Sequence, residues 1–183
     1  DGHHRMASSL INNQQGMCLA YILGKDQLKT YPFHRKISNI ENVNSIFSKL
    51  NKLFNVISIK NPKKNIQDLQ FYINKKWYRI ELENNKNRKL IEQLLVSKLA
   101  KKILNPVFNI KDERKDKNVI FIPGNRNMKE EISKIKKNEI LFFMNTIDIN
   151  TIIQIAKKGQ TTPPKSTFIL PKLPSGLIMM ELK

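Results

Sequence analysis

The sequence predicts an α/β protein with a mixed sheet and flanking helices, incomplete at its N-terminus. Strand-like and helix-like segments alternate in the final third of the chain, which favours at least some parallel strand pairing. Residues 42–54 and 90–104 carry apolar side chains at helical spacing. The chain begins inside a glycine turn, so we expect a further strand upstream of Asp1.

Short helices and strands, separated by turn residues, are predicted in the first half of the chain. The predicted helices cover residues 6–14 and 42–54. The predicted strands cover residues 17–23, 28–31, 56–59, 69–73 and 77–82. Gly24-Lys25-Asp26 separates the first two strands, and Asn74-Lys75-Lys76 between the last two is typical of a hairpin turn.

Longer helices are predicted in the second half. Residues 90–104 form the clearest helix, which Pro106 is expected to end. Asp148 is the predicted N-cap of another helix and Gly159 its C-terminal stop. The remaining predictions are helices over residues 128–137 and 148–158, and strands over 119–122, 140–144, 169–170 and 177–181.

The length of 183 residues suits a single domain or part of one. We expect residues 1–183 to be the C-terminal portion of a larger α/β protein whose N-terminal half is absent. Such a fragment would be poorly soluble and inert by itself. No run of about 18 apolar residues is present, so no membrane partner is expected. A single cysteine, Cys18, forms no internal disulfide and fits a cytoplasmic location.

The net charge of +18 raises the question of nucleic acid. However, 27 of the 33 basic residues are Lys, and they are spread along the chain. Nucleic-acid surfaces favour Arg, whose planar fork makes bidentate contacts. The densest charged run, residues 111–117, mixes both signs and indicates a solvated loop. We therefore expect only weak, non-specific nucleic-acid binding and attribute the lysines to an AT-rich genome.

The N-terminal segment Asp1-Gly2-His3-His4-Arg5 has the parts of a phosphate site. Gly2 allows close backbone approach, the following helix offers unpaired N–H groups, and Arg5 can grip an oxyanion with two bonds. The alternative is a remnant of a purification tag. The tail motif described below argues against that alternative.

Two further polar clusters lie beside predicted strands, the first at the end of a strand and the second at the entrance to one. The first is the pair His34 and Arg35. The second, residues 159–172, resembles a P-loop but carries Pro164, which has no N–H, where that loop needs a glycine. A double proline still makes a stiff loop that presents Lys165, Ser166 and Thr167. No zinc spacing or other metal site is predicted.

These segments together resemble a known family. Asp1 to Arg5, Pro32-x-His34-Arg35, Gly124-x-Arg126, Pro163 to Thr167 and Pro171 to Leu177 are similar, in order, to the C-terminal half of domain-of-unknown-function family 1015. Residues 2–7 also resemble the phosphate-binding turn of the ParB/sulfiredoxin-like group, which includes free serine kinases. The resemblance implies phosphate or nucleotide binding and a link to serine or phosphoserine metabolism. Leu170 stands where the family usually has an acid, so no metal or base role is assigned to the tail.

The leading hypothesis is an enzyme of phosphoryl transfer or phosphate-ester chemistry that acts on a small metabolite. Its partner would be a phosphorylated metabolite or nucleotide, and its candidate cofactor ATP or ADP with Mg²⁺. The alternatives are a nucleic-acid-binding or regulatory protein and a non-catalytic metabolite-binding domain. His3 and His4 are the predicted proton carriers, and the catalytic carboxylate is expected in the missing half. The predicted ligand-binding residues are Asp1, Gly2, Arg5, His34, Arg35, Lys165, Ser166, Thr167 and Lys172.

Overall fold

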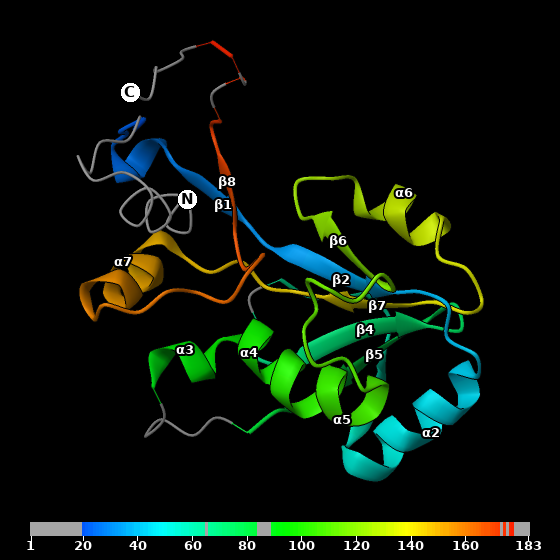
Figure 1. Cartoon of the computed structure of the whole chain (residues 1–183). Coiled ribbons are helices and arrows are strands. Elements are labelled where there is room, and N and C mark those ends of the chain that lie inside the picture. Colours follow the sequence, from blue (N-terminus) through cyan, green and yellow to red (C-terminus); the bar gives the residue numbers. More distant parts are fainter. Residues whose placement is uncertain (1–19, 65, 84–88, 173, 175, 178–183) are drawn as a thin grey trace.

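The computed structural model describes residues 20–183, except residues 65, 84–88, 173, 175 and 178–183. Its centre is a six-stranded sheet with the order β3-β5-β4-β7-β2-β6. The strands are β2 (Phe33–Ile37), β3 (Val56–Ile59), β4 (Leu69–Ile73), β5 (Lys76–Ile80), β6 (Val119–Pro123) and β7 (Ile140–Phe143). Helices and sheet together confirm the α/β class (Figure 1).

The strand directions differ from the prediction. Every strand pair in the described part of the chain is antiparallel, so the expected parallel pairing is wrong. The alternation of β6, α6 and β7 suggested parallel neighbours. Both strands do run antiparallel to β2 and hence parallel to each other, but β2 lies between them. The pairing depends on a strand from far earlier in the sequence.

A two-stranded ribbon projects from this sheet. It consists of β1 (Lys29–Tyr31) and β8 (Phe168–Leu170), which are antiparallel (Figure 1). Buried Pro32 separates β1 from β2 and has no N–H to donate to a neighbouring strand. The ribbon therefore places the segment after residue 160 next to the start of β2.

Helices cover both faces of the sheet. They are α2 (Val43–Leu53), α3 (Leu90–Gln93), α4 (Leu95–Leu99), the π-helical turn η2 (Ala100–Leu104), α5 (Asn105–Phe108), α6 (Met128–Ser133) and α7 (Ile149–Lys157). Helices α2, α4 and α5 lie along one face, where Phe71, Leu99 and Ile103 are fully buried (Figure 1). Trp77 and Leu141 belong to a smaller core under α6.

The helix predicted over residues 90–104 is interrupted and longer. Leu94 has an extended backbone (ψ 136°) that separates α3 from α4. Pro106 does not end the helix, so that prediction is wrong. The wider turn of η2, where the N–H of Asn105 donates to the carbonyl of Ala100, accommodates the proline at the start of α5. The chain leaves the helix only at Asn109, in the left-handed region at φ 57°.

The other predicted limits of helices and strands agree only in part with the structure. Residues 20–23 form no strand, and the short 3-10 helix η1 (Lys25–Gln27) follows Gly24. Helix α6 ends at Ser133 instead of residue 137. Leu177 is exposed and lies in no strand. The predicted helix over residues 6–14 lies outside the described residues. In the described part of the chain, no helix is both long and apolar enough to cross a bilayer.

Candidate functional site

Three of the motifs found in the sequence meet around β2. The N–H of Gly124 donates to the carbonyl of Pro32 at 2.8 Å, and a Cβ atom on Gly124 would lie only 2.6 Å from the Pro32 ring. The ring of Phe33 makes an edge contact with Phe168 (centroids 5.7 Å apart) and lies 5.3 Å from the ammonium of Lys165. Segments far apart in the sequence therefore share one region of the surface and core.

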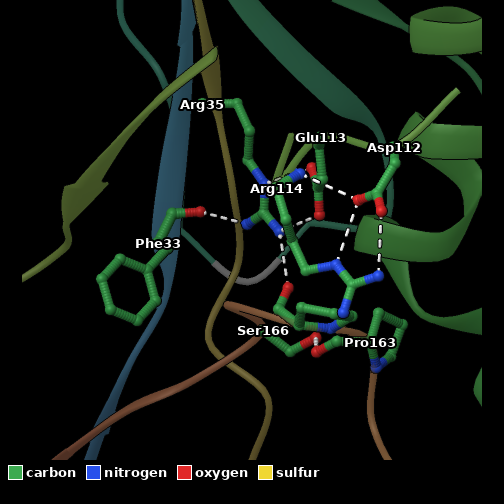
Figure 2. A network of polar contacts seen from close by, with 8 residues as sticks. Phe33, Arg35, Asp112, Glu113, Arg114, Pro163 and Ser166 are labelled. Atoms are coloured by element: carbon green, nitrogen blue, oxygen red, sulfur yellow. Dashed lines mark hydrogen bonds and ion pairs between the residues drawn. The ribbon is translucent and has the colours of Figure 1, made fainter. Parts of the chain in front are cut away.

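Arg35 is the centre of this region (Figure 2). Its side chain is fully buried, yet its guanidinium makes an ion pair with Glu113 at 3.0 Å (Nη2 to Oε1) and 3.2 Å (Nε to Oε2). Nη1 donates to the carbonyl of Phe33 at 2.5 Å, and Nη2 donates to the carbonyl of Pro164 at 3.4 Å. A buried charge needs such partners. Arg35 thus ties β2 to two loops.

The charged run of residues 111–117 is not simply a solvated loop. Asp112 and Arg114 pair with each other at the surface, at 2.9 Å, and the hydrogen bonds from Arg114 lower the pKa of Asp112 to about 2. Glu113 between them turns inward, and only 11% of its side chain is exposed (Figure 2). The interpretation as a wholly solvated segment is wrong because Glu113 compensates the buried Arg35.

His34 points to the opposite face of β2 from Arg35, as alternate residues of a strand do. It is 1% exposed, its ring stacks on Phe143 at 4.5 Å, and its Nδ1 accepts a hydrogen bond from the N–H of Met144 at 3.0 Å. Burial, followed by the charge of Arg35, lowers the pKa of His34 to about 4. The imidazole is therefore neutral at pH 7, and the structure does not bring it together with the Arg35 guanidinium.

A cavity of about 370 Å³ opens beside Arg35. Its wall includes residues 93–96, the segment that follows β7, and the start of α7. Three of its polar residues are more than nine-tenths buried: Arg35 (0% exposed), Lys98 (8%) and Ser166 (5%). Pockets of this size suit small molecules.

One unsatisfied polar atom belongs to the same wall. Asn145 donates through Nδ2 to the carbonyl of Ile66, whereas its buried Oδ1 has no hydrogen-bond partner among the described residues. Asp148 supplies the carboxylate of this wall, and hydrogen bonds from Thr151 lower its pKa. The cavity therefore combines two cations, one carboxylate and a free acceptor.

The loop of residues 163–167 lies against this cavity. Ser166 donates from Oγ to the carbonyl of Pro163, and Lys165 adopts a left-handed backbone at φ 52°. Lys165 and Lys172 are exposed, and their ammonium groups lie over the rings of Phe33 and Phe168, the latter at 4.7 Å. The structure thus brings Arg35 and Ser166 to one cavity and leaves the two lysines beside it.

The remaining predicted site residues lie away from the cavity wall or outside the described residues. Asp1, Gly2, His3, His4 and Arg5 lie outside the described residues. Thr167 is half-buried next to Ser166. Within the described ranges, no group of three His, Cys, Asp or Glu side chains could hold a metal ion.

Sequence reasoning missed Lys98, Glu113 and Asn145. For Lys98 a signal was available, since a lysine stands within the apolar stripe of residues 90–104. Glu113 and Asn145 had no comparable signal, because one stands in a run of mixed charges and the other follows a strand without a motif.

Comparison with known proteins identifies the family. Residues 1–102 match the model of a family described as protein of unknown function (DUF1015). The chain belongs to this family. The tail motif of residues 163–177 lies beyond the matched segment. No curated protein matches the chain.

Several solved structures are similar to this chain. SbnI with a C-terminal truncation from Staphylococcus aureus is 12% identical, with a TM-score of 0.54 over 96% of this chain and 62% of that one. A conserved hypothetical protein from Pyrococcus furiosus is 17% identical, with a TM-score of 0.51 over 93% and 68%. Free serine kinase in complex with AMP is 18% identical, with a TM-score of 0.48 over 93% and 66%. The chain therefore spans about two thirds of the length of these proteins, and the first two matches establish a shared fold only.

Proposed function

We propose that this chain is part of an enzyme of phosphoryl transfer or phosphate-ester chemistry, and that the cavity beside Arg35 binds the phosphate of a small metabolite or nucleotide. The observation that carries the proposal is the gathering of Arg35, Lys98 and Ser166, each more than nine-tenths buried, at one cavity. An ammonium group and a hydroxyl are donors that suit phosphate oxygens. Buried polar groups of this kind make stronger hydrogen bonds to a ligand than exposed groups do, because the local dielectric constant is low.

The roles divide between donors and support. Lys98 donates to phosphate oxygens, and Ser166 does so by turning its one hydroxyl proton from the carbonyl of Pro163 to the ligand. Arg35, already bonded to Glu113 and Pro164, holds the loop that carries Ser166. The neighbouring Lys165, Thr167 and Lys172 add charge and a hydroxyl. Phosphoryl transfer needs mainly positioning and charge neutralisation, which such a set supplies.

The N-terminal turn is assigned the second half of the site. Arg5 grips phosphate oxygens in a bidentate manner with Asp1 and Gly2 at the turn, and His3 or His4 moves a proton. ATP or ADP is the proposed nucleotide, and serine or phosphoserine the proposed metabolite. Mg²⁺ would be held mainly by phosphate oxygens, together with one or two carboxylates.

The test is calorimetric titration of the purified protein with ADP, AMP, phosphoserine and inorganic phosphate. Lys98→Met and Arg5→Ala should each weaken binding about 10- to 150-fold, which is roughly 1.5–3 kcal/mol for a hydrogen bond to a charged group. Arg5→Lys should recover only part of the loss, since an ammonium lacks the planar fork.

Lys101→Met is the matched control. Lys101 stands three residues after Lys98, but its side chain is exposed and pairs with Glu92 at the surface. Its removal should leave affinity unchanged. Equal affinity of the wild type and Lys98→Met for every compound would contradict the assignment of the cavity. Binding without phosphoryl transfer or phosphate release would favour the non-catalytic alternative.

A further inference from the structure

We propose that Glu113 is a positioning residue of the phosphate site: through Arg35 it holds the loop of residues 163–167 against the cavity. This inference rests on the proposed function for the ligand, but the loop geometry stands on the contacts alone. Glu113 belongs to a different loop and is not part of the cavity wall. It acts on the site only through the Arg35 guanidinium.

The bidentate contact fixes the direction of the guanidinium. Glu113 accepts hydrogen bonds from both Nε and Nη2 of Arg35. The planar guanidinium therefore cannot rotate about the Cδ–Nε bond without losing one of these two hydrogen bonds. In this orientation Nη2 also reaches the carbonyl of Pro164 at 3.4 Å (Figure 2). One nitrogen therefore joins the carboxylate to the loop.

The loop needs such a support. Lys165, the residue after Pro164, has φ 52°, a left-handed conformation that costs a non-glycine residue free energy. Ser166 follows and reaches the cavity wall. A hydrogen bond to Pro164 immediately before the strained residue holds the chain where Ser166 can face a ligand.

A second ion pair on β2 provides a matched control. Lys36 pairs with Glu139 at 3.0 Å, the same separation as between Arg35 and Glu113, and the Glu139 side chain is 6% exposed. This pair points to the other face of the strand from Arg35. Glu139→Gln therefore removes a buried carboxylate of similar surroundings without touching the Arg35 network.

Limited trypsin digestion of the native protein tests the geometry without a ligand. The measured quantity is the cleavage rate at Lys165–Ser166 divided by the rate at Lys158–Gly159, both exposed lysines. Glu113→Gln should raise this ratio at least about tenfold, because the loop leaves its support, whereas Glu139→Gln should leave it unchanged. An unchanged ratio in Glu113→Gln, or an equal rise in both variants, would overturn the proposal.

Titration with ADP is the second measurement. Glu113→Gln should weaken ADP binding about tenfold or more, since a displacement of about 1 Å at a site can cost about 100-fold, and Glu139→Gln should not. If the wild type binds no phosphate compound, the proposed function fails while the digestion ratio still decides whether Glu113 positions the loop. If Glu113→Gln does not fold, the double variant Arg35→Met with Glu113→Leu removes the buried charge and should show the same rise in the ratio.

Discussion

His34 and Arg35 are adjacent in β2 but have opposite surroundings. Arg35 is buried with its charge compensated by Glu113, whereas His34 is buried as a neutral ring against Phe143. The difference follows from the alternation of a strand, which sends neighbouring side chains into different cores. Arg35 therefore affects stability through a buried ion pair, and His34 through the burial of a neutral ring.

Acid should destabilise the protein through His34. Its pKa is about 4 in the folded protein and about 6.5 when exposed, so between these values the unfolded state binds more protons. The free energy of unfolding should therefore decrease as the pH falls from 6.5 towards 4, by about 2–3 kcal/mol at pH 4.5. Urea unfolding at pH 7 and pH 4.5 measures this change.

The control for this prediction is His34→Asn. The asparagine oxygen can accept from the N–H of Met144 but takes up no proton. The variant should lack the His34 part of the decrease, while the carboxyl groups with lowered pKa values, such as Asp112, contribute equally to both proteins. The prediction is wrong if both proteins lose the same free energy.

At the scale of elements, capping residues and breaks determine where several helices begin and end. Helices α2, α6 and α7 each begin after an Asn or Asp whose side chain accepts from a backbone N–H: Asn42, Asn127 and Asp148. The break at Leu94 is compensated differently. Ser97 donates from Oγ to the carbonyl of Ile91 at 2.6 Å, which satisfies a group that a continuous helix would bond internally.

Removal of the cap of α7 should cost about 1 kcal/mol of folding free energy. Asp148→Ala loses the acceptor for the N–H of Thr151, which lies 3.0 Å from Oδ1, whereas Asp148→Asn retains it. Urea unfolding at pH 7 compares the two variants. Asp26→Ala, at an exposed aspartate that caps no helix, should change stability by less than about 0.5 kcal/mol. Equal loss in the Ala and Asn variants would show that the cap is unimportant.

At the scale of the whole molecule, the net charge of +18 comes mainly from lysines distributed along the chain. The arginine at the centre of the motif cluster, Arg35, is used inside the protein, where its planar fork matches the carboxylate of Glu113. The overall charge and the candidate site are thus separate features. The charge still attracts polyanions through long-range electrostatics.

Binding to duplex DNA should be weak, independent of sequence and lost near physiological salt. The affinity of a phosphate-backbone binder falls with a logarithmic slope of about −0.9 per neutralised phosphate, and dispersed lysines neutralise few phosphates at once. Fluorescence anisotropy with two unrelated duplexes at about 50 and 150 mM salt measures this dependence. Sub-micromolar affinity for one sequence at the higher salt would instead favour a nucleic-acid-binding function.

Much of the fold was predictable because its determinants are local. The hairpin turn at Asn74 and Lys75, both with positive φ, and the limits of α7 between Asp148 and Gly159 follow from residues within one turn of each other. The antiparallel order was not predictable in this way. It depends on β2 entering between β6 and β7, a choice made by pairing across more than 80 residues of sequence.

The candidate site was likewise predictable only where its determinants are local. The sequence alone marked Arg35, Lys165 and Ser166 as polar candidates beside strands, because residue type and neighbouring turns suffice for that inference. The predicted position of Arg35 at the end of a strand is wrong, since Arg35 lies in the middle of β2. Only the tertiary structure decided which of them meet, how deeply they are buried and what compensates their charge. Glu113 is 78 residues from Arg35 and Pro164 is 129 residues away. Local patterns cannot specify such contacts, because burial and charge pairing are determined by whichever distant segments the folded chain brings together.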